Sequence, residues 1–532
     1  MKTAYINGHV YTITQDFCEA FVVENGRFIY VGNNQEAKSM ADEIVDLKEQ
    51  FVTCGFNDSH MHVLGFGHML EMMNLAVCTD SLAHLLASIK DYIEVNQIQE
   101  GQWLRGRGWN NDYFNDTHRF LNRYDLDQVS TTVPLVMTRA CGHVCVVNSK
   151  ALALLGITKD TPQVEGGHFD VDEHGEPLGI FREMALNLVY DPISKVSVDD
   201  LKRMIAHSCE ALNQYGITSA QTDDFTNFNV PFSDVIQAYA QLEKEGKLTV
   251  KINEQSQLPT MTLLKEFVEK DYHHYHTSMF KSGPLKLLGD GSLGARTAYL
   301  SYPYADDPKA KGISCFTQDE LDSLISYAHA HGMGAAIHCI GDGMMKMVVN
   351  SYRKVLKDDP KNSLRHGIVH CQITDEQLLK DFETLHLLAY IQPIFLDYDI
   401  TMVESRVGKE KAQKTYAFKT LYQKGHASGG SDCPVELPDV MKGIQCAVTR
   451  KNLNGVGPFV ANEAMSVKEA LTAFTLEGAY ASFEENEKGS IEKGKWADFV
   501  ILSENPFEVE ASELGRIQAL ATYVNGKQVY SR

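Results

Sequence analysis

The sequence predicts an α/β protein: a (β/α)8 TIM-like barrel with an inserted lobe after strand 1, plus a small β-sandwich formed from both chain termini. Three observations lead to this prediction. Eight short apolar segments recur through the middle of the chain, most of them separated by helix-like stretches. The two ends carry alternating strands broken by Asn-Gly. One interval, between the first and second apolar segments, is far longer than the others.

The chain termini are predicted to form one small domain. The segments "YINGHVYT" at 5–12, "FVVENGRFIYVGN" at 21–33 and "ATYVNGKQVYSR" at 521–532 alternate apolar and polar residues around Asn-Gly. This pattern is the strongest short-range hairpin signal. Because short hairpins are unstable alone, we expect residues 1–50 and 488–532 to pack together as a composite β-sandwich domain.

Residues 51–487 are predicted to form the barrel. Its expected strands are 51–56, 217–224, 248–253, 284–290, 333–338, 366–370, 387–393 and 425–432. Helix-like stretches at 317–332 and 374–386 separate some of them, and the second opens with a Thr-Asp-Glu-Gln capping pattern. Strand–helix alternation is typical of a parallel sheet, and eight such strands close a barrel.

The long interval, about residues 64–210, exceeds a simple crossover connection. It contains the apolar run "VPLVMTRACGHVCVVNS" at 133–149 and the hairpin-like "GGHFDVDEHGEPLG". We interpret it as an inserted lobe over the barrel mouth, where it would help to shape a substrate pocket.

Composition narrows the possible partners. The formal charge of −21 argues against nucleic acid or an anionic membrane surface. No apolar run approaches the ~20 residues of a membrane span, and the start shows no secretory signal. Eleven scattered cysteines, an odd count, fit reduced thiols in the cytoplasm. We therefore expect a cytoplasmic protein that acts on a small molecule, and the acidic surface is compatible with a homodimer.

The stretch "GFNDSHMHV" at 55–63 carries the first candidate site residues. Side chains alternate along a strand, so His60 and His62 point the same way and can bind one ion. An isolated motif this short more often marks a loop that happens to hold two histidines. Other strand ends decide between these interpretations.

Residues suited to metal binding lie at or near several other predicted strand ends: Lys286, His338, His370 and Asp432. Each has an ordinary alternative, since a histidine can be structural, Asp432 can cap a helix, and Lys286 can reach solvent. Active sites of such barrels gather at the carboxyl ends of the strands. The coincidence favours a site for one or two divalent metals, with zinc preferred by imidazole.

The motifs "GFNDSHMH", "KLLGDGSLGARTA", "AIHCIGDG", "HGIVHCQ" and "SGGSDCPV" closely resemble the amidohydrolase superfamily, in particular its amidohydrolase-3 branch of YtcJ-like metal-dependent hydrolases. The resemblance covers nearly the whole chain, including "KGSIEKGKWADFVIL" near the end. One departure is Cys54, where the family usually has proline. We expect it to alter a strand end and leave the ligands unchanged.

The resemblance implies the roles of the candidate ligands. His60, His62 and Asp432 would bind one metal, while His338 and His370 would bind a second or complete the first. Lys286 occupies the position where a carboxylated lysine often bridges two metals, and its modification needs a neutral amine. One and two metals both remain open. Asp432 would be the general base for a metal-activated water and then the proton donor to the departing amine.

The expected reaction is hydrolysis of an amide C–N bond in an N-acyl or N-formyl small molecule. Three further residues are candidates for substrate binding. His143 would hydrogen-bond the substrate or be structural; Arg296 would hold a substrate carboxylate or pair with Asp290. Trp109 would line the pocket or pack in a core.

Three alternatives have weaker support. A deaminase of a nucleobase-like or amidine substrate would carry a His-x-x-x-Glu pattern, but His338 is followed by "CIGDG". A catalytically silent metal-binding or regulatory protein would usually lack one or more ligands, and none is missing. A sugar-processing barrel needs paired carboxylates, for which only Asp432 and Asp223 or Asp224 are candidates.

Overall fold

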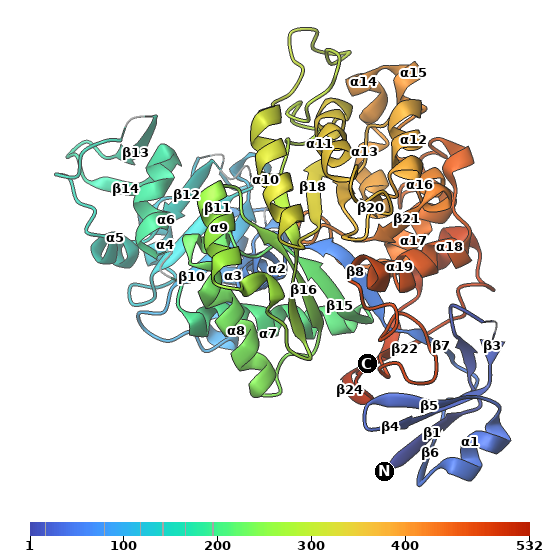
Figure 1. Ribbon diagram of the computed structural model, residues 1–532. Helices are drawn as coiled ribbons and strands as arrows, with labels where there is room; N and C mark the ends of the chain where they lie inside the picture. The colour runs from blue at the N-terminus through green and yellow to red at the C-terminus, as the bar shows by residue number, and fades with distance from the viewer. Residues whose placement is uncertain (16, 79, 118, 141–142, 165, 194–195) are drawn as a thin grey trace. The chain divides into compact units, whose positions relative to one another are not determined.

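Eight parallel strands form the central sheet, which confirms the predicted TIM-like barrel (Figure 1). A computed structural model describes residues 1–532 except 16, 79, 118, 141–142, 165 and 194–195. The barrel strands follow one another in chain order: β8 (Phe56–Met61), β15 (Ile217–Thr222), β16 (Lys251–Gln257), β17 (Phe280–Leu288), β18 (Ala335–Cys339), β19 (Gly367–His370), β20 (Leu388–Ile391) and β21 (His426–Gly429). The backbone N–H of Asp432, just past β21, donates to His60 O at 2.8 Å and so links the last strand to the first.

The first barrel strand differs from the prediction. Residues 51–56 were expected to form it, but β7 (Phe51–Cys54) belongs to a separate sheet and the barrel strand begins at Phe56. Gly55 joins the two strands where the backbone passes Thr218 closely. A Cβ added at Gly55 would lie 2.2 Å from Thr218 Oγ1, so glycine allows the chain to pass from one sheet to the other.

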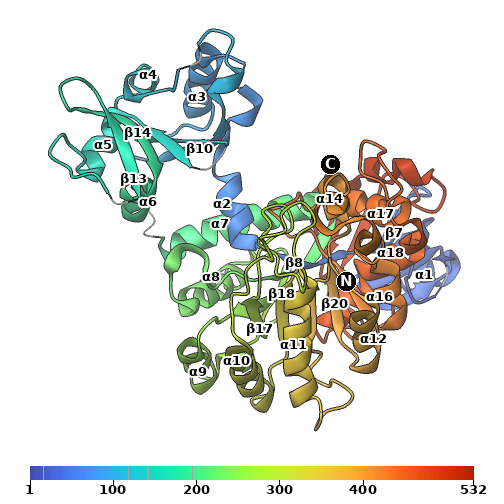
Figure 2. The same ribbon diagram turned by 90° about the horizontal axis from the view of Figure 1, so that it is seen from above.

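Helices cover the outside of the barrel strands, as Figure 2 shows for α8 to α12. These helices are α7 (Val198–Gln214), α8 (Phe232–Lys244), α9 (Met261–Glu269), α10 (Gln318–Ala330), α11 (Asp342–Val355), α12 (Glu376–Thr384), α16 (Phe418–Lys424), α17 (Val440–Thr449), α18 (Val467–Ala473) and α19 (Leu476–Ala481). The two helices predicted from capping and periodicity are confirmed as α10 and α12. Thr317 and Asp375 are their N-caps, and each side chain accepts a backbone N–H of the first turn.

The two chain ends share one sheet, of order β24-β23-β22-β7-β2-β3, and a second sheet has the order β5-β4-β1-β6 (Figure 1). Their strands are β1 (Lys2–Ile6), β2 (His9–Tyr11), β3 (Phe17–Cys18), β4 (Ala20–Glu24), β5 (Arg27–Gly32), β6 (Glu43–Asp46), β22 (Phe499–Leu502), β23 (Ala519–Val524) and β24 (Lys527–Ser531). Phe499 contacts Tyr5 and Phe21 with ring centroids 5.1 and 5.0 Å apart, which joins residues from both ends. The expected limits of the sandwich domain, residues 1–50 and 488–532, remain a prediction.

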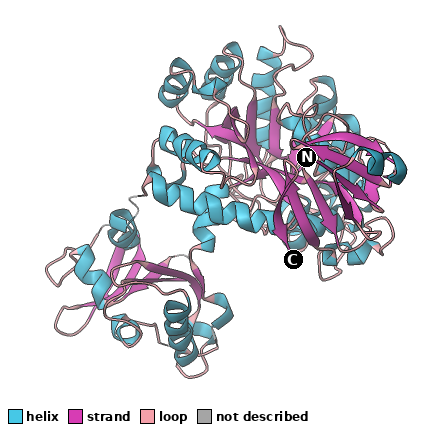
Figure 3. Cartoon of the chain, turned by 90° about the horizontal axis from the view of Figure 1, so that it is seen from below, coloured by secondary structure: helices cyan, strands magenta, loops and turns pink. Residues whose placement is uncertain are grey.

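The chain divides into two compact units, Met1–Phe66 with Leu201–Arg532, and Gly67–Asp200. The second unit has its own sheet, drawn in magenta in Figure 3, of strands β9 (Met73–Asn74), β10 (Leu104–Trp109), β11 (Leu135–Arg139), β12 (Val144–Val147), β13 (Gly167–Val171) and β14 (Pro177–Glu183). Its helices include α3 (Leu82–Val95), α4 (Arg123–Asp127), α5 (Ser149–Leu155) and α6 (Asn187–Ile193). The unit has its own buried apolar clusters. The expected placing of the lobe over the barrel mouth stays a prediction.

Two further observations concern membrane-spanning helices and cysteine pairing. Among the described residues, no helix combines the length and the apolar character needed to cross a bilayer. The ten cysteines that the structure describes are all free thiols.

Candidate active site and metal centre

Three of the predicted ligands, His60, His62 and Asp432, meet at the carboxyl end of the barrel. Their ligand atoms lie within 4.8 Å of one another. Asp432 Oδ1 is 3.0 Å from His62 Nε2 and 3.4 Å from His60 Nε2. His60 and Asp432 are buried. The group has the imidazole and carboxylate donors that suit a divalent cation such as zinc.

The other two histidines lie beside this group. The rings of His338 and His370 have centroids 4.4 Å apart, and the His370 ring lies 5.4 Å from that of His60. His338 is the penultimate residue of β18 and His370 the last residue of β19, so the parallel sheet brings both to one rim. His370 (φ 79°) and Asp432 (φ 59°) both have left-handed backbones, a strained conformation that concentrates at functional sites.

Each of the four histidines has its Nδ1 atom beside an acceptor that lies outside the predicted ligand set. The pairs are His60 with Gln255 Oε1 at 2.8 Å, His338 with Asp290 Oδ1 at 3.0 Å, His370 with Gln392 Oε1 at 2.8 Å, and His62 with Asp223 Oδ1. An acceptor at Nδ1 places the proton there and leaves Nε2 as the nitrogen for a cation. This shared orientation fits a metal centre, and the sequence alone did not indicate that these four partners orient the histidines.

Lys286 is fully buried within the same group. Its Nζ donates to Asp223 Oδ2 at 2.8 Å and lies 3.5 Å from His60 Nε2. Burial raises the pKa of Asp223, but His62 and Lys286 outweigh this effect and lower it below its usual range. Asp223 is therefore a buried, ionised carboxylate at the centre of the site. Its position just after β15 was a signal for this role.

The protonation states fit metal binding. Burial raises the pKa of Asp432, but the neighbouring His60 and His62 side chains outweigh this effect and lower it well below its usual range. Burial lowers the pKa of His60 and, with His338 nearby, that of His370, so both imidazoles are neutral near pH 7. Burial also opposes the charged form of His62, but Asp223 and Asp432 raise its pKa well above the usual value. Metal binding by His62 would therefore release a proton.

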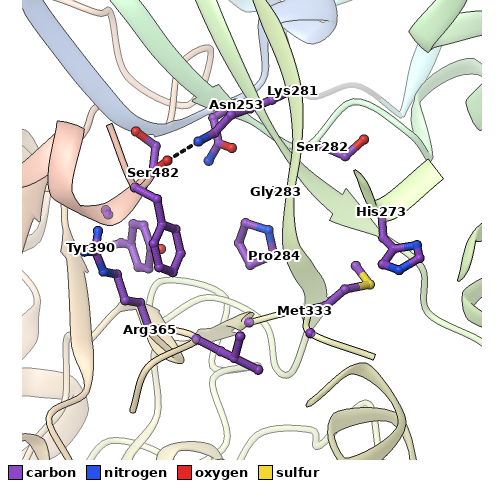
Figure 4. Close-up of a pocket in the computed structure, with 15 residues that line it drawn as sticks. Asn253, His273, Lys281, Ser282, Gly283, Pro284, Met333, Arg365, Tyr390 and Ser482 are labelled. Carbon is purple, nitrogen blue, oxygen red and sulfur yellow. Dashed lines mark hydrogen bonds between the residues drawn. The ribbon is translucent and has the colours of Figure 1, made fainter. Parts of the chain in front are cut away.

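A cavity of about 550 Å³ opens beside the ligand group and includes His338 and Asp432 in its lining. A smaller cavity, of about 150 Å³, lies at the amino ends of the strands, where Lys281 and Pro284 line it (Figure 4). None of the predicted ligands lines the smaller cavity. We assign the chemistry to the larger cavity because it adjoins the predicted ligands.

The three candidate substrate-binding residues have other contacts. Arg296 pairs with Asp306, with Nη2 3.0 Å from Oδ2, and not with Asp290 as expected. Asp290 instead accepts hydrogen bonds around His338. Trp109 is fully buried in the second unit, and its Nε1 donates to Met137 O at 2.9 Å, which is the core role that the sequence left open. His143, also in the second unit, is exposed and contacts Glu183 Oε2 at 2.9 Å.

Known proteins resemble this chain over its whole length. The amidohydrolase family profile matches residues 43–530. YtcJ of Bacillus subtilis (strain 168), which its name places among the amidohydrolases, is 31% identical over 543 residues, 100% of each chain. The N-substituted formamide deformylase of Arthrobacter pascens is 25% identical, covering 99% of this chain and 98% of its own. An uncharacterized metal-dependent hydrolase from Pyrococcus furiosus has a TM-score of 0.79 at 29% identity, covering 96% of this chain and 100% of its own.

Proposed function

The chain belongs to the amidohydrolase family, and on this basis we propose that it cleaves the C–N bond of an N-acyl or N-formyl small molecule. The observation that carries this proposal is the meeting of His60, His62 and Asp432 at one barrel rim beside a large cavity. The similarity to a protein named N-substituted formamide deformylase supports a small amide or formamide as substrate.

The proposed centre holds one or two divalent cations, with zinc favoured by the histidines. His60, His62 and Asp432 would bind the first, and His338 and His370 would bind a second or complete the first. These residues would hold a cation that would lower the pKa of a water molecule and polarise the substrate carbonyl. The Nδ1 partners described above would keep each imidazole turned toward it.

Asp432 is the proposed proton carrier. Its Oδ1 atom contacts both His60 and His62, which leaves Oδ2 to accept a proton from the attacking water. Because the pKa of this carboxyl is held low, it is ionised and ready to accept that proton at neutral pH. The same group then donates the proton to the departing nitrogen, so one residue serves as base and acid in turn.

Carboxylation of Lys286 is a further part of the proposal. The Nζ atom is buried and next to Asp223 Oδ2, at 2.8 Å. A carbamate there would set a second negative charge beside Asp223, so its stability would depend on a cation held in the centre. Enrichment with ¹³C-bicarbonate and a carbamate signal in the ¹³C spectrum, absent from Lys286→Met, would support the modification.

The test of the proposed function pairs metal analysis with one variant. Protein purified without chelator is expected to contain a divalent metal and to release amine from N-formyl amines, N-acyl amino acids or cyclic amides. Asp432→Asn is expected to lower the rate by about 10²–10⁴-fold, the range for loss of general acid–base catalysis. Near-wild-type hydrolysis by a metal-loaded Asp432→Asn protein would rule out the proton-carrier role.

Two other results would favour the alternatives. Release of ammonia from an amidine-containing base, without amine release from any amide, would indicate a deaminase. Bound metal without turnover of any compound would indicate a metal-binding protein that is not a catalyst. A cytoplasmic location and a homodimer stay predictions.

A further inference from the structure

The 550 Å³ cavity beside the ligand group has several hydrogen-bond acceptors in its lining, and its described lining includes no lysine or arginine. Its acidic lining residues are Asp399, Asp432 and Glu436. Arg296, the candidate for holding a substrate carboxylate, pairs with Asp306 and lies outside this lining. The charge in the cavity is therefore suited to a cation and not to an anion.

Gln372 provides an independent sign of a ligand. Its side chain is 97% buried, lines the cavity and donates from Nε2 to Asp399 Oδ2 at 3.2 Å. Because that carboxylate oxygen accepts, the amide must be oriented with Oε1 facing away from it. Oε1 is buried and has no hydrogen-bond partner among the described residues. Buried acceptors of this kind are normally satisfied, so Oε1 is available to a donor group of a molecule bound in the cavity.

Asp399 and Glu436, the two lining carboxylates outside the ligand group, also have oxygen atoms that no described donor contacts. Asp399 Oδ2 accepts from Tyr416 Oη at 2.6 Å and from Gln372, while no described residue donates to Oδ1. For Glu436 the described residues offer neither a hydrogen bond nor an ion pair. Burial and the neighbouring carboxylates Asp397 and Asp399 raise the pKa of Glu436 to about 7. A bound cation would relieve that repulsion.

Much of the remaining lining is apolar or aromatic. Side chains of this kind are Leu293, Ile340, Phe395, Tyr398, Met402 and Val435. A cavity of about 550 Å³ lies within the ~300–1,000 Å³ range of small-molecule sites. An aliphatic or aromatic body of a ligand would contact these side chains, while its donor groups would reach the acceptors.

We propose that the substrate is an N-acyl or N-formyl compound that also carries a cationic amine or amidine on an apolar body, and that Gln372, Asp399 and Glu436 select this cation. The inference rests on the proposed function, since it takes the cavity to be the substrate site. It also disfavours N-acyl amino acids, because the described lining has no lysine or arginine to hold their carboxylate.

Binding of three isosteric probes tests the inference without turnover. Isothermal titration of the metal-containing protein with benzamidine, benzamide and benzoate compares a cation, a neutral amide and an anion of the same shape. Benzamidine is expected to bind at least tenfold more tightly than the other two. Equal or tighter binding of benzamide or benzoate would overturn the inference.

Matched variants locate the effect. Glu436→Gln, and then Glu436→Gln with Asp399→Asn, are expected to weaken benzamidine binding at least tenfold while benzamide binding stays unchanged. Glu404→Gln, an exposed change on α14 (Val403–Val407), is the control and is expected to bind like the wild type. Circular dichroism checks folding, and Glu436→Gln removes no described hydrogen bond. Unchanged benzamidine binding in the folded double variant would refute the role of these residues.

A hydrolysis comparison separates this inference from the proposed function. A mono-N-formyl diamine is expected to have kcat/KM at least tenfold above that of a neutral N-formyl amine of the same length, and Glu436→Gln should remove most of the difference. Equal hydrolysis of both would overturn the inference and leave the proposed function intact. Selective benzamidine binding without any amide hydrolysis would overturn the proposed function and leave only the preference of the cavity for a cation.

Discussion

Asp290→Asn is expected to destabilise the barrel because the buried Asp290 carboxylate accepts four hydrogen bonds. Oδ1 accepts from His338 Nδ1 at 3.0 Å and from Ile340 N at 3.0 Å. Oδ2 accepts from Tyr299 N at 2.9 Å and Gly341 N at 2.8 Å. The residue is buried, 4% exposed, so water cannot replace the lost acceptor. Asparagine keeps one oxygen and turns a donor toward the other two groups.

The magnitude follows from those two unsatisfied donors. Each costs about 1–3 kcal/mol, so the free energy of unfolding is expected to fall by about 2–6 kcal/mol. For a unit of roughly 400 residues, the usual unfolding entropy converts this loss into a Tm about 2–7 °C lower. The released imidazole of His338 is also expected to lower metal affinity or activity by about 10–100-fold.

Differential scanning calorimetry of the wild type and Asp290→Asn measures the Tm, with Asp358→Asn as the control. Asp358 is exposed and its side chain makes no described hydrogen bond. The control is expected to melt with the wild type. If Asp290→Asn melted within 1 °C of the wild type, the account of four essential acceptor contacts would be wrong.

Three more predictions concern the affinity for metal, the close backbone approach at Gly55, and the pH dependence of stability. Gln392→Leu removes the acceptor at an imidazole Nδ1, so the metal Kd measured by competition with a chelator is expected to rise about 10–100-fold without loss of fold. Gly55→Ala would place Cβ 2.2 Å from Thr218 Oγ1 and is expected to lower the Tm, whereas Gly425→Ala, whose Cβ has only an ordinary contact at 3.5 Å, is expected to leave it unchanged. Burial raises the pKa of Glu484, but two neighbouring lysines lower it to about 2. The ionised Glu484 therefore contributes about 3 kcal/mol to the free energy of unfolding above pH ~4.5, and this contribution is lost as the pH falls to about 2. Urea unfolding of Glu484→Gln should show a smaller loss of stability over that pH range than the wild type.

Much of the barrel could be predicted because its signals are local. Apolar segments, helix periodicity and N-caps depend on residues within a few positions of one another, and they located most strands and the helices α10 and α12. The candidate ligands were also visible, since a strand end is a local feature and parallel strands end at one rim.

The errors arose where pairing between distant segments decides the structure. The apolar run 51–56 looks like one strand, but β7 pairs with β22 near the other end of the chain, and Gly55 sets the boundary. Arg296 has two acidic candidates nearby in sequence, and the fold of the loop gives it Asp306. No local pattern distinguishes these outcomes.

The amides that orient the histidines show the same limit. Gln255 and Gln392 lie in or beside buried strands, where a polar side chain is unexpected. The sequence does not show which group each of these amides contacts. Their role depends on which strands become neighbours in the sheet. β19 pairs with β20 and brings Gln392 beside His370, while Gln255 on β16 reaches His60 on β8, two strands away.

The sequence by itself determined that this is a barrel of alternating strands and helices with histidines and an aspartate at its strand ends, because both features are set by short-range periodicity. Only the tertiary structure decided which sheet each terminal strand joins, which acceptor orients each imidazole, and that the cavity is lined with acceptors. Those properties depend on contacts between residues far apart in the chain, and such contacts exist only once the chain has folded.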